Sequence, residues 1–425
     1  MKIRKLFLNL LFWSLLVLSL SCKGDSGLQT EPPPPDDNGD NGDNGNGNAT
    51  HPQQDIPWPS LADSPWPMYR HDPQGTGRSA FAGPASQPDI QWNFFVPGQI
   101  FSSPVIGPSG NIYFGADDKN FYCVDPSGSL VWSIETESPI IATPLITADS
   151  SIIFGNIGGA QRQALLFKTD LNGQIKWTLA LDSGVASSIT IDLSGDFYFV
   201  SDNSQLYSVA PSGFVRWKAA IDSVDRFATP VFSPDGNTIY LTGRNINAVN
   251  LDGTMKWKFI PTAPAYRDAV VDSDGNIYFV TSDRGIFYSI TPENTMRWQR
   301  QLSDSRIESN SSPTIDNEGN LYDVLGDTLY AFTNIGELRW ILSMGGRGYA
   351  HLSCDNLGTV YFGSTTSQPA IVLAIFSTGT IAWQVSLVRA VDTNIALTSD
   401  GALYFGTSSG FAVPTNEGRG IFAIR

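Results

Sequence analysis

The chain contains few of the residue types on which most enzyme and metal sites depend. Its 425 residues include only three histidines and three cysteines, and no CxxCH motif for haem attachment occurs. Hydrolase triads and zinc centres need a base or several ligands that converge in space, so this scarcity argues against both. So few cysteines also exclude a disulfide framework, and we expect stability to come from a packed core.

Positive charge is scarce as well. The chain has 26 Lys and Arg against 41 Asp and Glu, which gives a formal net charge of −15. Affinity for nucleic acid depends on cationic side chains that neutralise phosphates. We therefore expect no nucleic-acid partner.

What the chain does contain is a regular series of tryptophans. Eight of its 11 tryptophans recur at intervals of 40–45 residues. They are Trp92, Trp132, Trp177, Trp217, Trp257, Trp298, Trp340 and Trp383. A period of this length is typical of a four-stranded propeller blade that is copied many times. We expect these side chains to pack between blades, because their large rings bury much area.

The residues before each tryptophan indicate how a blade is built. A glycine stands four residues before most of them, as Gly128 does before Trp132, and Asn294 takes this place before Trp298. A position that accepts glycine or asparagine is typical of a left-handed turn, so the flanking runs are predicted to form a hairpin. An earlier glycine turn, followed by β-branched and aromatic runs, completes four strands, A to D, with the tryptophan on strand D.

The two ends of the chain are predicted to complete one blade together. The last unit ends at Arg425, after its strand C and before any tryptophan, whereas Trp92 has no strands A to C before it. We therefore predict an all-β fold, an eight-bladed β-propeller of four-stranded antiparallel blades whose N-terminal strand closes the last blade. Closure of the ring removes sheet edges that invite aggregation.

The N-terminal segment is typical of an export signal. Residues 1–22 combine a positively charged start with an apolar stretch that is short for a membrane span. The run Ser19-Leu20-Ser21-Cys22 resembles a bacterial lipobox, and the resemblance implies cleavage before Cys22 and lipidation of this cysteine. We expect a lipid-anchored protein of the cell envelope, and Lys23 favours the outer membrane. The alternative is secretion with soluble release.

Three further segments follow the signal. Residues 23–57 are rich in Pro, Asp, Asn and Gly and are predicted to be a disordered tether. Residues 58–89 are predicted to be a lead-in that packs on the propeller. Residues 90–425 are predicted to form the propeller itself, as a monomer.

The repeats resemble the tryptophan-docking repeats of pyrroloquinoline quinone (PQQ) propellers. The pattern A/S-x-D/N-x-x-G-x-x-x-W is matched closely by residues 248–257 and 123–132, and the lead-in sequence of residues 66–79 is typical of the same family. The resemblance covers roughly residues 66–425. The family includes alcohol and sugar dehydrogenases, and also non-catalytic members such as the lipoprotein of the outer-membrane β-barrel assembly machinery.

The chain departs from the catalytic members of that family. Their alcohol dehydrogenases place a vicinal Cys–Cys disulfide over the cofactor and carry calcium ligands with a catalytic Asp, and no matching residues occur here. We therefore expect no cofactor, no metal site and no catalytic residues. PQQ with calcium, as in a quinoprotein dehydrogenase, is the alternative.

The most suggestive residues lie in the predicted loops from strand D of one blade to strand A of the next. Five successive loops carry an arginine: Arg226, Arg267, Arg306, Arg347 and Arg389. Tyr266, Tyr349 and His351 complete the set of candidate binding residues. An arginine arc on one rim suits a carboxylate, a phosphate or a docking protein. Alternatively, nearby Asp and Glu side chains neutralise the arginines in local ion pairs.

We therefore predict a membrane-anchored, non-catalytic binding or scaffold propeller whose partner is an envelope protein or an anionic ligand. The quinoprotein dehydrogenase is the first alternative. A glycan-binding propeller is the second, on the strength of exposed aromatic side chains. Fold alone does not choose among them.

Overall fold

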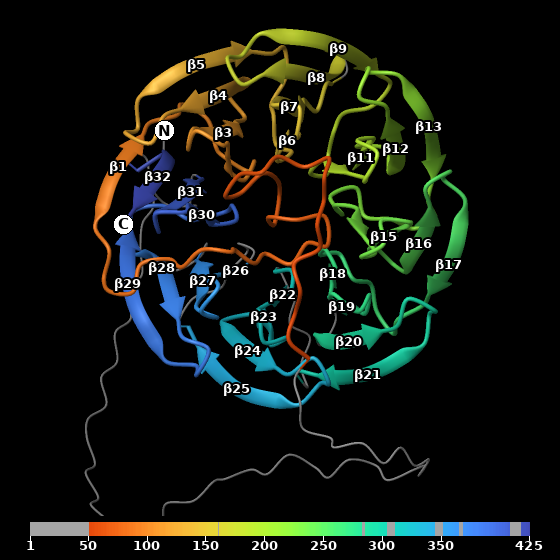
Figure 1. Ribbon diagram of the computed structural model, residues 1–425, viewed down its shortest axis with the longest axis vertical. Helices are drawn as coiled ribbons and strands as arrows, with labels where there is room; N and C mark the ends of the chain where they lie inside the picture. The colour runs from red at the N-terminus through yellow and green to blue at the C-terminus, as the bar shows by residue number, and fades with distance from the viewer. Residues whose placement is uncertain are drawn as a thin grey trace, which may run out of the picture. The chain divides into compact units, whose positions relative to one another are not determined.

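The computed structural model describes residues 51–159, 161–282, 285–303, 311–344, 352–364, 369–408 and 418–425. The chain divides into two compact units, Met1–Asn48 and Ala49–Arg425, and every described residue belongs to the second. The second unit contains eight four-stranded antiparallel sheets arranged as a ring (Figure 1). The predicted eight-bladed propeller is therefore confirmed.

Each blade runs from a short inner strand A to an outer strand D. The A strands are β2 (Val105–Ile106), β6 (Leu145–Ile146), β10 (Thr190–Ile191), β14 (Val231–Phe232), β18 (Val270–Val271), β22 (Thr314–Ile315), β26 (Ser353–Cys354) and β30 (Ala396–Leu397). The B strands are β3 (Ile112–Gly115), β7 (Ser151–Gly155), β11 (Phe197–Val200), β15 (Thr238–Leu241), β19 (Ile277–Val280), β23 (Leu321–Leu325), β27 (Val360–Gly363) and β31 (Leu403–Thr407).

The outer half of each blade consists of strands C and D. The C strands are β4 (Asn120–Val124), β8 (Ala164–Asp170), β12 (Gln205–Val209), β16 (Ile246–Asn250), β20 (Ile286–Ile290), β24 (Thr328–Phe332), β28 (Ala370–Ile375) and β32 (Gly420–Ile424). The D strands are β1 (Ile90–Phe94), β5 (Leu130–Glu135), β9 (Ile175–Leu181), β13 (Val215–Ala220), β17 (Met255–Phe259), β21 (Met296–Gln301), β25 (Leu338–Ser343) and β29 (Ile381–Leu387). We number the blades 1 to 8 from β2 onward.

Because the strands are antiparallel, their connections fall on two opposite faces of the ring. We call the face with the A–B and C–D turns the turn face, and the face with the B–C turns and D–A loops the loop face. The glycines of the C–D turns have φ between 82° and 86°, and Asn294 has φ of 67°. These values confirm the left-handed turns predicted from the sequence.

The N-terminal strand closes the ring as predicted. Blade 8 has the strand order β30, β31, β32, β1, and β1 pairs antiparallel with the C-terminal strand β32. The pairing places Trp92 opposite Ala423 and Phe94 opposite Ile421. In Figure 1 the first strand, β1, and the last strand, β32, accordingly lie side by side in the same blade.

The eight tryptophans join each blade to the next one. Seven of the eight indole Nε1–H groups donate to a backbone carbonyl of the following C–D turn, at 2.8 to 3.1 Å. Blade 8 has no C–D turn of its own, since its strands C and D come from opposite ends of the chain. The carbonyl of Pro84, in the lead-in, accepts from Trp383 at 2.8 Å in place of that turn.

The core lies within and between the blades. The B strands are buried along their whole length, whereas the D strands alternate between exposed and partly buried residues. This is the pattern expected when only the outermost strand of a sheet borders on solvent. Among the described residues, no helix has the length and hydrophobicity needed to cross a membrane.

Candidate functional site: the loop face and the filled axis

Exposed aromatic side chains occupy equivalent positions on the loop face. Phe101, Phe227 and Tyr266 each stand four residues before their A strand and are 44%, 46% and 43% exposed. Tyr349 has the same spacing in the sequence but lies outside the described residues. The repeat therefore places a set of large rings at one level of the loop face.

Arg226 and Phe227 form the most polar part of this surface. The guanidinium carbon of Arg226 lies 4.5 Å from the ring centroid of Phe227, which is the geometry of a cation–π contact. Arg226 also forms an ion pair with Asp202, in the B–C turn of blade 3, and both side chains are half-exposed. An exposed pair of this kind is weak and can exchange partners.

A backbone bridge holds the two loops that carry Phe227 and Tyr266. Gly243, in the B–C turn of blade 4, bridges to Val224 on one side and to Ala265 on the other. The amide of Ala265 donates to the carbonyl of Gly243 at 2.8 Å. A Cβ at Gly243 would lie 2.1 Å from a backbone oxygen, so only glycine fits this position. The loops before blades 4 and 5 thus form one connected surface.

Of the predicted arginine arc, only Arg226, Arg267 and Arg389 lie within the described residues. Arg267 is partly buried, and Arg389 is buried, so that burial and the charge of Arg419 lower the pKa of Arg389. Arg306, Arg347 and His351 lie outside the described residues, as does the predicted lipidation site, Cys22. Of the three described arginines of the predicted arc, Arg226 has its guanidinium over an exposed aromatic ring, that of Phe227.

A ring of polar side chains lies below these aromatic residues, two residues before each A strand. The described members are Ser103, Thr143, Ser188, Thr229, Asp268, Ser312 and Asn394, and all are buried. Several accept a hydrogen bond from the same position of the preceding blade, as Asp268 Oδ1 does from the Thr229 amide at 2.8 Å.

Asp268 is the one acidic member among the described residues of this polar ring. Its second oxygen, Oδ2, accepts from the Tyr69 hydroxyl of the lead-in at 2.7 Å. Burial raises the pKa of Asp268 above its usual value, although the hydrogen bonds from Tyr69 and Thr229 oppose this. The lead-in thus reaches through the ring to the level of the loop face.

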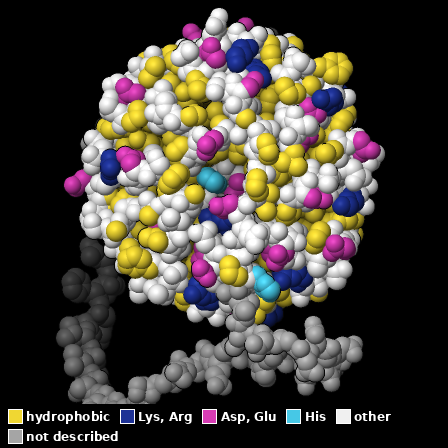
Figure 2. Space-filling view, in the orientation of Figure 1, with side chains coloured by type: hydrophobic (Ala, Val, Ile, Leu, Met, Phe, Trp, Pro, Cys, Tyr) yellow, Lys and Arg dark blue, Asp and Glu magenta, His cyan; other side chains and the backbone are white. Residues whose placement is uncertain are grey.

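The lead-in fills the axis of the propeller. It crosses the middle of the ring in Figure 1, and Figure 2, in the same orientation, shows no open bore at the centre of the ring. Its backbone forms hydrogen bonds with residues of six A strands, namely Ile106, Ile146, Phe232, Val271, Ile315 and Cys354. In blade 3 the indole of Trp58 instead donates to the carbonyl of Ile191 at 2.9 Å. The lead-in therefore contacts the inner strands of seven of the eight blades.

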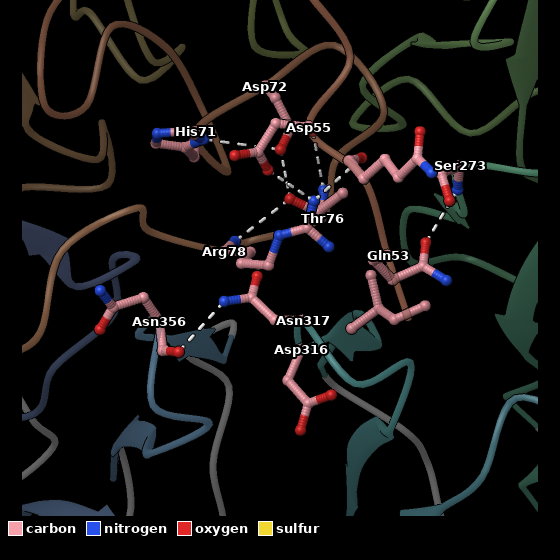
Figure 3. Close-up of polar contacts among 12 residues, drawn as sticks. Gln53, Asp55, His71, Asp72, Thr76, Arg78, Ser273, Asp316, Asn317 and Asn356 are labelled. Atoms are coloured by element: carbon pink, nitrogen blue, oxygen red, sulfur yellow. Dashed lines mark hydrogen bonds and ion pairs between the residues drawn. The ribbon is translucent and has the colours of Figure 1, made fainter. Parts of the chain in front are cut away.

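Polar contacts join the lead-in to the segment just before it, and that segment to the turn face (Figure 3). Arg78 forms a 2.8 Å ion pair with Asp55, and the Gln53 side chain accepts from the Ser273 amide. The structure differs here from the sequence prediction, which assigned residues up to 57 to the tether. Most contacts of residues 51–56 involve backbone groups, which leave no pattern in the side chains.

Metal-ligating groups are not assembled in the described part of the chain, where no cluster of three or more His, Cys, Asp or Glu could hold a metal ion. Cys123 and Cys354 are both buried and free, on β4 and β26 of different blades. What the structure does assemble is a covered axis on the turn face and an aromatic surface on the loop face.

Comparison with known proteins identifies the family. The family model described as outer membrane protein assembly factor BamB matches residues 84–246 and 203–371, which together span more than half of the chain. The chain belongs to this family. None of the curated proteins is significantly similar to it in sequence.

Solved structures share the BamB-like propeller at low identity. The crystal structure of BamB from Moraxella catarrhalis superimposes with a TM-score of 0.60 and 14% identity, covering 79% of this chain and 99% of that one. A europium-containing methanol dehydrogenase has a TM-score of 0.66 and 11% identity, covering 85% and 97%. Saccharomyces cerevisiae Sqt1 has a TM-score of 0.62 and 11% identity, covering 80% and 98%. At these identities the likeness shows the fold alone.

Sequence reasoning about this member of the BamB family missed the residues that fill the axis. Tyr69 and Arg70 stand between a tryptophan and a glycine-containing turn, but nothing in their spacing indicates which blade they contact. Phe101 and Phe227 were missed as well. Their shared distance from the A strands was a usable signal, because equivalent positions of a repeat lie at one level of the ring.

Proposed function

We propose that this protein is a non-catalytic binding propeller of the cell envelope that docks a protein on its loop face. The family description, outer membrane protein assembly factor, supports a partner from the machinery that assembles outer membrane proteins. The observation that carries the proposal is the connected surface of Arg226, Phe227 and Tyr266 around Gly243.

The chemistry of this surface suits a protein better than a small anion. Aromatic residues and arginine are the types most enriched at the centres of protein interfaces. Phe227 and Tyr266 are nearly half exposed, so a partner can bury much additional ring area. Arg226 is held by an exposed ion pair and by its contact with Phe227, and it is available for a carboxylate of the partner. Arg389, being buried, is a poor contact for a large ligand.

The filled axis supports a function without a quinone. A bound quinone and its calcium ion need an open cavity with several oxygen ligands. At the axis of this ring the space belongs to the lead-in, whose backbone pairs with the A strands. These residues do not fit such a group. We therefore expect no stabilising shift in the melting temperature (Tm) when PQQ and calcium are added together, and a clear positive shift would contradict the proposal.

A lipid anchor at Cys22 is compatible with docking on the loop face. The chain meets the propeller on the turn face, where the carbonyl of His51 accepts from the Asn334 side chain at 3.3 Å. The first described residue, His51, thus lies on the face opposite the proposed docking surface. Replacement of Cys22 by Ser is expected to move the protein from the membrane fraction to the soluble fraction. Unchanged fractionation would refute the anchor and leave the docking proposal intact.

Site-specific cross-linking tests the docking surface. A photoreactive phenylalanine analogue at Phe227 should capture one defined partner in cells. The same analogue at Leu357, a 71% exposed residue of the turn face, is the matched control. Each of Phe227→Ala and Tyr266→Ala should weaken binding of the purified partner about 30-fold, the effect of losing a residue worth about 2 kcal/mol at an interface. Capture at Leu357 alone, or full affinity in both variants, would show that the partner docks elsewhere.

A further inference from the structure

A buried arginine lies at the axis of the ring and takes no part in the docking surface. Arg70 has no exposed area, although arginine is rarely buried without compensation. Its backbone has φ of 54°, and His71 follows with φ of 73°, both in the left-handed region that non-glycine residues avoid. The chain therefore adopts an unfavourable turn in order to place this side chain.

The guanidinium of Arg70 is surrounded by oxygen atoms. Its Nε donates to the carbonyl of Gly75 at 2.8 Å, and Nη1 donates to the carbonyl of Ser312 at 3.3 Å. Its Nη2 donates to the carbonyl of Pro313 and, at 3.2 Å, to Oγ1 of Thr314. Three backbone carbonyls and one hydroxyl thus follow the planar fork of donors that distinguishes arginine from lysine.

The hydroxyl of Thr314 is oriented for this contact. It donates its own hydrogen to the carbonyl of Leu352 in blade 7, at 2.8 Å. Its oxygen is therefore left to accept from Arg70. Through this one residue the guanidinium is connected to blade 7 as well as to blade 6.

The lead-in folds around its own arginine. The amide of Gly77 donates to the carbonyl of Arg70 at 3.0 Å, and a Cβ on Gly77 would lie 3.5 Å from Nη2 of Arg70 and 2.8 Å from Oγ1 of Thr314. Asp72 closes the same turn by accepting from the amide and the hydroxyl of Thr76. The segment is thus shaped to present one guanidinium to the ring.

The charge of Arg70 also has a counterpart. Asp268 lies close enough for the positive charge of Arg70 to lower its pKa, against the larger effect of burial. Tyr69, the neighbour of Arg70, donates to this carboxylate. A buried cation is tolerated only when its donors are all used and an opposite charge is near. Arg70 makes four hydrogen bonds, and the carboxylate of Asp268 is near.

We propose that residues 66–82 are a built-in axial ligand of the propeller, and that the oxygen-lined socket of Ser312, Pro313 and Thr314, which the ligand's own Gly75 carbonyl completes, is a receptor site for a guanidinium group. The ring binds the arginine of its own chain where a propeller with an open axis would admit a separate molecule. Since the socket belongs to blade 6, contacts blade 7 through Thr314 and lies beside Asp268 of blade 5, its occupant holds these three blades together.

Chemical rescue tests the receptor site. Arg70→Gly removes the guanidinium and suits the positive φ, so the backbone turn is retained. We expect its Tm to fall by about 5 °C for a ring of this size. Methylguanidinium added at concentrations far below denaturing ones should raise this Tm, and should appear between the carbonyls of Ser312 and Pro313 in a crystal structure of the variant.

Two further variants decide the outcome. Arg70→Met fills the space without donors, so we expect a Tm as low as that of Arg70→Gly and no response to methylguanidinium. Arg226→Gly removes an exposed arginine and should not respond either. If methylguanidinium raises the Tm of Arg70→Gly no more than that of Arg226→Gly, or if Arg70→Met is as stable as the wild type, the socket does not select a guanidinium. Should Arg70→Gly fail to fold, Arg70→Lys against Arg70→Met still separates the charge and donors from the filled volume.

Discussion

At Trp298 and Gly336, the effect of a contact between two blades on stability can be distinguished from the effect of the turn conformation. Gly336 has φ of 86°, and a Cβ there would lie 2.6 Å from Cδ2 of Trp298. Gly195 has a similar φ of 92°, but its Cβ would meet only a proline carbon at 3.5 Å. Alanine at the two positions therefore imposes the same backbone cost but a very different packing cost.

The expected magnitudes follow from these distances. Left-handed backbone costs an alanine about 1–2 kcal/mol, which is the whole effect expected for Gly195→Ala. Gly336→Ala also pushes the indole outward, at about 1–3 kcal/mol for overpacking. The displaced indole weakens its 3.0 Å hydrogen bond to the Asn334 carbonyl, worth about 1 kcal/mol. We expect a total loss of about 3–6 kcal/mol for Gly336→Ala.

Thermal unfolding followed by circular dichroism measures the difference. For a ring of this size, Gly336→Ala should lower the Tm by about 5 °C and Gly195→Ala by about 2 °C. Gly336→Asn should lie between them, since Asn294 already occupies the equivalent position in blade 5 with φ of 67°. Equal losses for both alanine variants would refute the view that the tryptophans hold the blades together.

Three other predictions address separate contacts. Burial opposes ionisation of Asp149, but hydrogen bonds from a threonine and from Lys168 outweigh it and lower the pKa of Asp149 to about 2. This stabilisation is present above pH of about 4 and is lost as the pH falls toward 2. Asp149→Asn should therefore lower the free energy of unfolding, measured by urea titration, by about 1 kcal/mol at neutral pH and by nothing near pH 2. The loss at neutral pH is small because the carboxylate is 59% exposed. Tyr69→Phe removes the shorter of the two hydroxyl hydrogen bonds to Asp268, at 2.7 Å from Tyr69 against 3.4 Å from Ser312, and should lower the free energy of unfolding by about 1–3 kcal/mol in the same assay. Gly243→Ala should displace both adjoining loops and weaken partner binding while the Tm falls only slightly; unchanged affinity would show that the bridge does not position them.

The repeat could be predicted from the sequence because each blade uses the same residues for the same contact. The tryptophans mark the D strands, and the unfinished last unit indicated that Trp92 comes from the other end of the chain. The hydrogen-bond acceptor of the Trp383 indole could not be predicted from the sequence. It is the carbonyl of Pro84, and a backbone carbonyl carries no signature in the sequence.

The arginine-bearing loops show the opposite case. Their arginines look alike in the sequence, yet Arg389 is buried whereas Arg226 is half-exposed and pairs with Asp202. Asp202 belongs to the neighbouring blade and was not among the acidic residues close to Arg226 in the chain. Which arginine meets which carboxylate depends on the spacing between blades, which the repeat pattern does not contain.

The sequence by itself determined the number of blades, the place of each strand and the closure of the ring, because these follow from a periodic pattern of side chains that every blade must satisfy. Only the tertiary structure decided what lies at the axis. The lead-in reaches the A strands through backbone hydrogen bonds, and Arg70 meets carbonyls more than two hundred residues away in the chain. Such contacts depend on where the ring brings the backbone together, and any residue can supply a carbonyl.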